Sequence, residues 1–206
     1  MAIYMKILKN DFILKFFTLI ALSFFTYNIF LSIEYNNGKV LLLLLFGEII
    51  TMTLVLFSKS TNNRDFSLIS IVLTLSATFY FFFVDLNSGI PLINPILAEI
   101  IMFLAILWQI FSKIYLGRNF GLLPACRGVV TTGPYRVVRH PIYFGYFLMH
   151  IGFLLSNFSV YNALLYALLY SLQFGRMYYE EKTLKQNEDY VHYMKKVKYR
   201  FIPFLV

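Results

Sequence analysis

Residues 133–145 read GPYRVVRHPIYFG, and the interpretation of the whole chain starts from this stretch. It places two Arg, one His and two Tyr at the start of an apolar segment. Ionisable groups at the edge of a bilayer are costly to bury, so such a cluster indicates a functional site. A second polar cluster, 176–181 (RMYYEE), follows two apolar segments later. The two clusters together predict one site at one face of a membrane.

Composition indicates a polytopic membrane protein. Of its 206 residues 59% are hydrophobic and the mean hydropathy is +0.69, whereas soluble domains are about 45–50% apolar. The net charge of +8 suits loops that face the cytoplasm and anionic membrane lipids. Because no nucleic-acid-binding module accompanies that charge, we expect no nucleic-acid partner. The single cysteine, Cys126, excludes an internal disulfide and a multi-cysteine metal site.

Six apolar segments predict an all-α membrane bundle of about five to six spanning helices. Crossing a bilayer takes about 20 residues; the first four segments have that length, and the last two, with about 15 residues each, would form only ~22 Å of helix. The last two are therefore either tilted spans or a partly inserted hairpin. We expect a single domain over 1–206, with spanning helices in 1–92 and a catalytic half in 93–206. The segments are 12–33, 40–57, 66–84, 93–115, 142–156 and 160–174.

The stretch 113–141 differs from the rest of the chain. It contains four Gly and three Pro, which predicts irregular backbone, and its apolar residues argue for an ordered connector loop. From Met177 onward the chain is polar and helical in pattern. With a cytoplasmic N-terminus and six crossings, Lys39 is the only basic residue in an outer loop, as the positive-inside rule demands. The site is then expected to face the cytoplasm.

The sequence lacks the motifs of metal sites, of nucleophilic serine sites and of nucleotide-binding sites. The three histidines, His140, His150 and His192, form no metal-binding pair, so we predict no metal. His150 lies within an apolar helix and is interpreted as a hydrogen-bonded packing residue. The sequence has no Gly-x-Ser-x-Gly elbow, no phosphate-binding loop and no dinucleotide-binding fingerprint. What remains is a site made from the connector, a helix entrance and the tail helix.

The helix entrance and the tail carry the remaining candidates. Pro141 is expected to open a helix with His140 near its cap, where free amides hold a carboxylate well. Arg176 and Glu180 are four residues apart and share a helix face. Simpler interpretations stay open: an ion pair between those two that contributes only ~0.3–0.5 kcal/mol, and arginines 136 and 139 as anchors for lipid phosphates.

The motifs resemble those of a known family. The relevant stretches are 131–145, the Glu-Glu-x-x-Leu run 180–184, Tyr190-x-x-Tyr193, and 200–203 (RFIP). In this order they resemble the C-terminal half of the isoprenylcysteine carboxyl methyltransferases, and more broadly the membrane methyltransferases that include phospholipid methyltransferases. The resemblance covers 117–206, and 117–125 looks like the bacterial branch, whose acceptor is generally undefined. Tyr146 stands where the eukaryotic enzymes have Trp.

The resemblance implies S-adenosylmethionine as cofactor, in a cytosolic pocket capped by the connector and the tail. It implies that Arg176 binds an acceptor carboxylate as the substrate-binding residue, with Glu180 as the other catalytic residue. An arginine suits this role because its planar fork binds a carboxylate at two points. The implied cofactor contacts are Arg127, Gly128, Val129, Val130, Tyr135, His140, Pro141, Ile142, Tyr143 and Glu180.

We therefore expect an integral membrane methyltransferase that uses S-adenosylmethionine to O-methylate the carboxylate of an isoprenylcysteine-like or other lipophilic, lipid-linked acceptor. Membrane lipids are its other expected partners, and the acceptor would enter from the bilayer. One alternative is methylation of a phospholipid or a thiol. Another is a nicotinamide-dependent reductase of the sterol type, since those enzymes share a related pattern. A small transporter is a third, although the sequence lacks the two related halves of many transporters.

Overall fold

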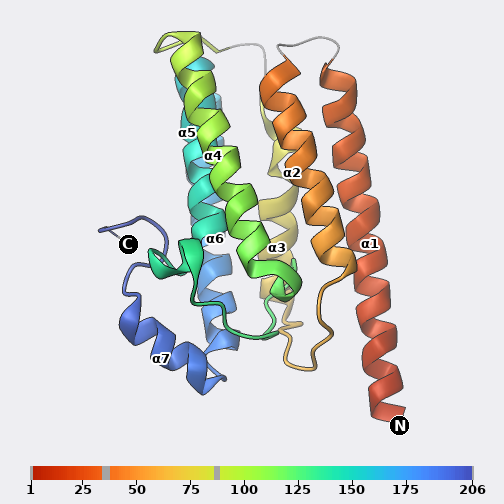
Figure 1. Cartoon of the computed structure of the whole chain (residues 1–206). Helices are drawn as coiled ribbons and strands as arrows, with labels where there is room; N and C mark the ends of the chain where they lie inside the picture. The colour runs from red at the N-terminus through yellow and green to blue at the C-terminus, as the bar shows by residue number, and fades with distance from the viewer. Residues whose placement is uncertain (1, 34–37, 86–88, 206) are drawn as a thin grey trace.

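The computed structural model describes residues 2–33, 38–85 and 89–205, and these residues form seven α-helices and no named strand. Figure 1 shows six of the helices side by side in an elongated bundle, with α7 at one end of it. The helices are α1 (Ala2–Ile33), α2 (Gly38–Leu56), α3 (Leu68–Phe79), α4 (Pro95–Leu116), α5 (Pro141–Ser156), α6 (Val160–Leu184) and α7 (Glu188–Lys196). The predicted outer loop 34–39 falls outside the described residues at its first four positions.

Local sequence signals set where the helices begin. The side chains of four N-cap residues accept backbone N–H groups in the first turns of α3, α4, α6 and α7, which satisfies donors that lack an intrahelical partner. Those residues are Ser67, Asn94, Ser159 and Asn187. Proline opens α4 and α5; the sequence predicts this for α5, and His140 is its N-cap residue.

The last spanning segment and the tail form one helix instead of two. The sequence separates the apolar segment 160–174 from a polar helical tail, but α6 continues without interruption for 25 residues, or ~38 Å. Gly175 does not break it, because this glycine lies against α3: a Cβ atom there would be 3.2 Å from Leu73 Cδ1. Arg176 and Glu180 therefore extend rigidly from the bundle toward the connector.

A second correction concerns Lys113. The sequence places it at the end of the apolar segment 93–115, at the start of the irregular stretch 113–141, and counts it among the cytoplasmic charges, but its side chain is buried inside the bundle on α4. Its ammonium donates to Thr51 Oγ1 at 2.8 Å and lies 3.8 Å from Glu48 Oε1. These partners on α2 allow the charge to be buried. They lie far from Lys113 in the sequence, so a local pattern could not reveal them.

Helices α4 and α5 pack closely because α5 presents two glycines to its neighbour. A Cβ atom at Gly152 would be 2.7 Å from Met102 Cγ, and one at Gly145 would be 3.2 Å from the carbonyl oxygen of Ala105. Small residues allow helix backbones to approach in this way within membranes. The same helix carries His150, which is buried and exchanges hydrogen bonds with the hydroxyls of Tyr80 and Tyr170. The interpretation of His150 as a packing residue is thus confirmed.

The outer surface of the bundle is apolar, as a membrane protein requires. Two helical stretches, Phe12–Leu31 and Pro95–Asn119, are long and apolar enough to cross a bilayer, and three shorter apolar helices accompany them. Large hydrophobic side chains are exposed along α1 to α4 and on α6. Such a surface would aggregate in water, so it indicates insertion into lipid.

The turn between α5 and α6 lies at the same end of the bundle as the start of α4 (Figure 1). Phe158 in this turn pairs with Ile90 through two backbone hydrogen bonds of 2.8 and 2.9 Å, and Leu92 N donates to Leu155 O. Residues 90 and 92 immediately precede α4, a stretch long enough to span. The α5–α6 turn therefore reaches the level at which α4 begins, which favours two full crossings over a partly inserted hairpin.

This arrangement makes a testable prediction about topology. In a Cys126→Ser background, Phe158→Cys should react with a membrane-impermeant maleimide from outside the cell, and Ser60→Cys, in the loop at the opposite end, should react only after permeabilisation. Position 158 lies beside the outer start of α4 if the sequence-based orientation holds. Labelling of position 158 only from the cytoplasmic side would overturn the six-crossing topology.

Candidate functional site

The connector between α4 and α5 is held in place by the loop between α2 and α3. Cys126 N donates to Asn63 O at 2.9 Å, and Lys59 N donates to Arg118 O at 2.8 Å. Gly133 adopts a φ of 58°, a left-handed conformation that suits glycine, and a Cβ atom there would meet the Tyr115 ring. The predicted ordered, irregular connector is thus confirmed for the described residues.

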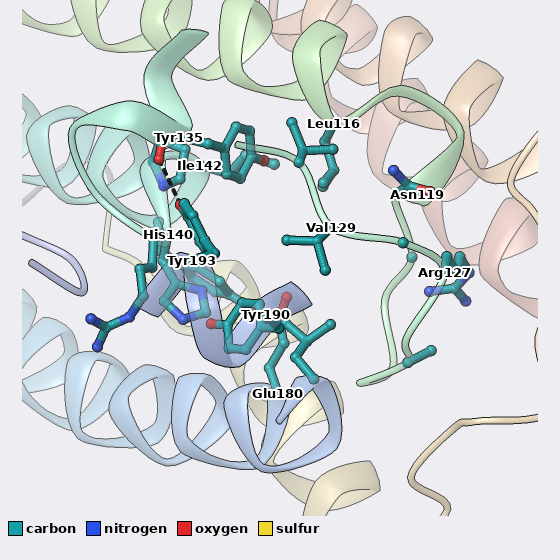
Figure 2. A pocket seen from close by; sticks show the side chains of 18 of the residues that line it. Leu116, Asn119, Arg127, Val129, Tyr135, His140, Ile142, Glu180, Tyr190 and Tyr193 are labelled. Atoms are coloured by element: carbon teal, nitrogen blue, oxygen red, sulfur yellow. Dashed lines mark hydrogen bonds between the residues drawn. The ribbon is translucent and has the colours of Figure 1, made fainter. Parts of the chain in front are cut away.

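A cleft opens between this connector, the start of α5, the end of α6 and α7. Its volume is about 690 Å³, which includes the solvent-open space at its mouth. Figure 2 shows Tyr135, Ile142 and His140 on one side of this hollow and Asn119 and Arg127 on the other.

The structure brings together all ten residues that the resemblance assigns to the cofactor, because every one of them lines this cleft. Their common location follows from the fold: the connector supplies one wall, the first turn of α5 a second, and Glu180 on α6 a third. Their role in binding a cofactor stays a prediction. Arg176 does not line the cleft and lies one helical turn before Glu180.

One wall of the cleft is aromatic and is fixed by the tail. Tyr193 on α7 is buried, and its hydroxyl donates to the carbonyl oxygen of Tyr135 at 2.6 Å, the dashed line in Figure 2. Tyr135, Tyr190 and Tyr193 pack in one cluster with Leu116 and Val129. This hydrogen bond holds α7 against the connector, so the tail closes one side of the cleft.

Two polar atoms at the cleft have no partner. Asn119 Oδ1 and the Tyr190 hydroxyl are both buried and make no hydrogen bond with the residues that the structure describes. Burial raises the pKa of Tyr190 above its ordinary value, so the hydroxyl stays protonated and is able to donate. Buried polar atoms are rarely left unpaired in folded proteins. Their position at the cleft indicates that a ligand supplies the missing partners.

Beneath the cleft, Glu181 is the centre of a buried charge cluster. Its carboxylate accepts hydrogen bonds from Arg139 Nε at 2.8 Å and from Arg200 Nη2 at 3.0 Å, and it lies 3.2 Å from His140 Nε2. Only 1% of Glu181 is exposed. The cluster joins the entrance of α5, the end of α6 and the C-terminal tail, so it fixes the three elements that surround the cleft.

The electrostatics of this cluster favour an ionised carboxylate. Burial alone would raise the pKa of Glu181, but the hydrogen bond and charge of His140 and the guanidinium groups of Arg200 and Arg139 together lower it well below its ordinary value. Backbone pairing supports the same junction, since Arg139 N donates to Tyr199 O and His140 N donates to Arg200 O.

Glu180, next to this cluster, faces the cleft, with Arg176 one turn away. Tyr143 OH donates to Glu180 Oε2 at 3.0 Å, and the Arg176 guanidinium lies 5.5 Å from the centre of the Tyr143 ring. Arg176 Nη2 donates to Leu122 O at 2.8 Å. The simple ion pair between Arg176 and Glu180 is not formed among the described residues, so that interpretation is wrong.

Sequence reasoning missed part of the site. The sequence motifs contain Glu181 and Arg200 but indicate no role for them, they leave Arg139 open as a lipid anchor, and they indicate no role for Asn119. Arg139 is instead mostly buried, with only 8% of its side chain exposed, and is bound to Glu181. The sequence signal that could have revealed the pair of Glu181 and Arg200 is the doublet of glutamates followed by a terminal Arg-Phe-x-Pro. Among the described residues no cluster of His, Cys, Asp and Glu could hold a metal ion.

Comparison with known proteins gives one family match. Residues 93–187 match the family model described as phospholipid methyltransferase. This segment runs from just before α4 to just beyond α6, and it includes the connector and both Glu180 and Glu181. A comparison with curated proteins found no significant match.

Proposed function

We propose that this chain is a membrane methyltransferase that uses S-adenosylmethionine to methylate the carboxylate of a lipophilic acceptor, and the match of residues 93–187 to the phospholipid methyltransferase family model supports this proposal. The observation that carries the proposal is the cleft, where all ten predicted cofactor residues and two unpaired polar atoms meet. The family match also favours methyl transfer over the reductase and transporter alternatives.

The residues at the cleft suit this cofactor chemically. S-adenosylmethionine has a flat base, ribose hydroxyls, and an amino-acid end with an ammonium and a carboxylate. Leu116, Val129 and Leu184 supply apolar surface for the base, while Asn119 Oδ1 and the Tyr190 hydroxyl supply an unpaired acceptor and an unpaired donor. Glu180 is the only acidic residue among the described residues that line the cleft, and it suits the ammonium.

When bound, this cofactor supplies a methyl group that a positively charged sulfonium makes reactive. The protein's part is to hold and align the acceptor. A carboxylate is already ionised at neutral pH, so its oxygen needs no base, and the rate depends on alignment. Arg176 would hold the acceptor carboxylate with its guanidinium fork, and Tyr143 keeps Glu180 directed toward the cleft through their hydrogen bond.

A phospholipid amine is the second candidate acceptor, and the description of the matched family favours it. An amine must lose a proton during methylation, and Glu180 is the carboxylate at the cleft that could accept it. In either case we propose that the acceptor enters from the bilayer, because its lipophilic part concentrates there. We also retain the expectation that the cleft faces the cytoplasm.

Cofactor binding is tested by calorimetry on the detergent-purified protein. Glu180→Gln should weaken S-adenosylmethionine binding by about 1.5–3 kcal/mol, since it removes a charged partner, and Tyr190→Phe by about 0.5–1.5 kcal/mol. His140→Ala should also weaken binding, although it disturbs Glu181 as well.

The matched control is Tyr199→Phe, which alters an exposed tyrosine of the same tail and should leave the affinity unchanged. Wild-type affinity in both Glu180→Gln and Tyr190→Phe, with the fold intact, would show that the cleft is not the cofactor site.

A further inference from the structure

Polar atoms without partners also occur deeper in the bundle, on the side of Arg176 away from the cleft. Gln173 Oε1 and Thr74 Oγ1 are buried, and each lacks a hydrogen-bond partner among the described residues, as does Arg176 Nε. Gln173 is 5% exposed and Thr74 is 3% exposed. An unpaired buried polar group costs about 1–3 kcal/mol, so three of them in one region require an explanation.

These groups lie at the same level of two helices that pack together. Gly175 on α6 faces Leu73 on α3, and Ala77 on α3 packs with Leu169 on α6 in one buried cluster. Thr74 belongs to the buried stripe of α3, together with Ser70 and Ala77. Gln173 belongs to the buried stripe of α6. Thr74 lies one turn from Ala77 and Gln173 one turn from Leu169 on these stripes, so both side chains face the interface between α3 and α6.

Gln173 is also close to Arg176, the proposed acceptor residue, along α6. Gln173 lies three residues before Arg176 on α6, so the two share a face and Gln173 is one turn deeper in the bundle. An acceptor carboxylate held by Arg176 would leave the following part of its headgroup beside Gln173 and Thr74. The unpaired atoms indicate which groups this part of the headgroup should carry. The amide oxygen of Gln173 accepts a hydrogen bond and calls for a donor, and the hydroxyl of Thr74 can donate one and calls for an acceptor.

We propose that Thr74 and Gln173 form a headgroup subsite that selects acceptors with a hydrogen-bonding group directly next to the reactive carboxylate. The proposal rests on the function proposed above for Arg176 and adds the specificity of that site. A plain fatty acid would leave both side chains unpaired, whereas a headgroup with a donor and an acceptor would satisfy them. Thr74 lies outside the segment that matches the family model, and Gln173 lies within it.

The test compares two lipids of equal chain length, N-hexadecanoylglycine and nonadecanoic acid, which differ by the amide beside the carboxylate. Binding to the full-length protein is measured by calorimetry in detergent micelles. The wild type should bind the amide-containing lipid about tenfold more tightly, the effect of one well-made buried hydrogen bond. In Thr74→Val and Gln173→Leu the difference should fall below about threefold.

Thermal unfolding separates this role from a structural one. Replacing an unpaired polar group by an apolar group of similar shape is neutral or stabilising, so both variants should melt at or above the wild-type temperature. The matched controls are Thr78→Val and Ser171→Ala, whose hydroxyls donate to Thr74 O and Ala167 O. These controls should keep the tenfold preference.

Equal binding of the two lipids by the wild type, or an undiminished preference in Thr74→Val and Gln173→Leu, would refute the subsite. Methyl transfer to both lipids is assayed in parallel and reports on the proposed function separately. A preference in binding without any methyl transfer would retain the subsite and reject the carboxylate methyltransferase.

Discussion

Glu181→Gln is expected to destabilise the folded protein by about 3–5 kcal/mol, because it removes the one anion from a buried cluster of cations. The carboxylate is 1% exposed and binds Arg139 and Arg200 directly. A neutral amide of the same size leaves the guanidinium of Arg139 buried without a counter-charge. For a protein of this size the midpoint of thermal unfolding should fall by about 10 °C.

The neighbouring residue provides the matched control. Glu180→Gln changes the same group one position along α6, but Glu180 is only partly buried and forms no ion pair among the described residues. It should change the melting temperature little and weaken cofactor binding instead. If the two variants melted at the same temperature, Glu181 would not be the residue that fixes the tail to the bundle.

The pH dependence of stability gives an independent check on Glu181. The pKa of its carboxyl is lowered in the folded protein relative to the ordinary value of 4.5. A lowered folded-state pKa means that the stabilisation is fully present above pH 4.5 and is lost as the pH falls below it. The difference in unfolding free energy between wild type and Glu181→Gln should therefore stay constant from pH 7 to pH 5 and shrink in stronger acid. A difference that grew on acidification would contradict this sign.

Arg176→Lys should lower methyl transfer by about 100-fold while leaving S-adenosylmethionine binding within about twofold of the wild type. Lysine keeps the charge but loses the planar fork that orients a carboxylate. The structure adds a second reason, since the guanidinium of Arg176 also donates to Leu122 O in the connector. Arg176 itself does not line the cleft, so cofactor binding should be spared.

The assay measures turnover of a lipophilic carboxylic acid and cofactor affinity on the same preparation. Arg118→Lys is the control, because Arg118 is an exposed arginine that donates to a backbone carbonyl, that of Phe57, and has no place in the proposed mechanism. Near wild-type turnover in Arg176→Lys would remove the carboxylate-binding role and leave the phospholipid amine or a thiol as the better acceptor.

Much of the site could be predicted from the sequence because its residues lie in a few short motifs. The connector glycines, the Pro141 helix entrance and the Glu180 turn each carry a local signal, and the resemblance placed them in one pocket. The partners within the site could not be predicted in this way. Successive residues of a helix point about 100° apart, so either glutamate of the doublet could have faced the cleft, and only the packing of α6 decides that Glu181 is buried.

The sequence by itself determined the helical, apolar character of the protein, the start of α5 at Pro141 and the irregular connector, because apolar length, proline and glycine act on the backbone locally. The tertiary structure alone decided which distant groups meet. It joined Arg139 and Arg200 to Glu181, placed Lys113 against Thr51, and left Gln173 Oε1 and Thr74 Oγ1 without a partner among the residues that the structure describes. The physical reason is that burial and charge pairing depend on contacts between helices, and no local pattern in one helix specifies the side chains that its neighbour presents.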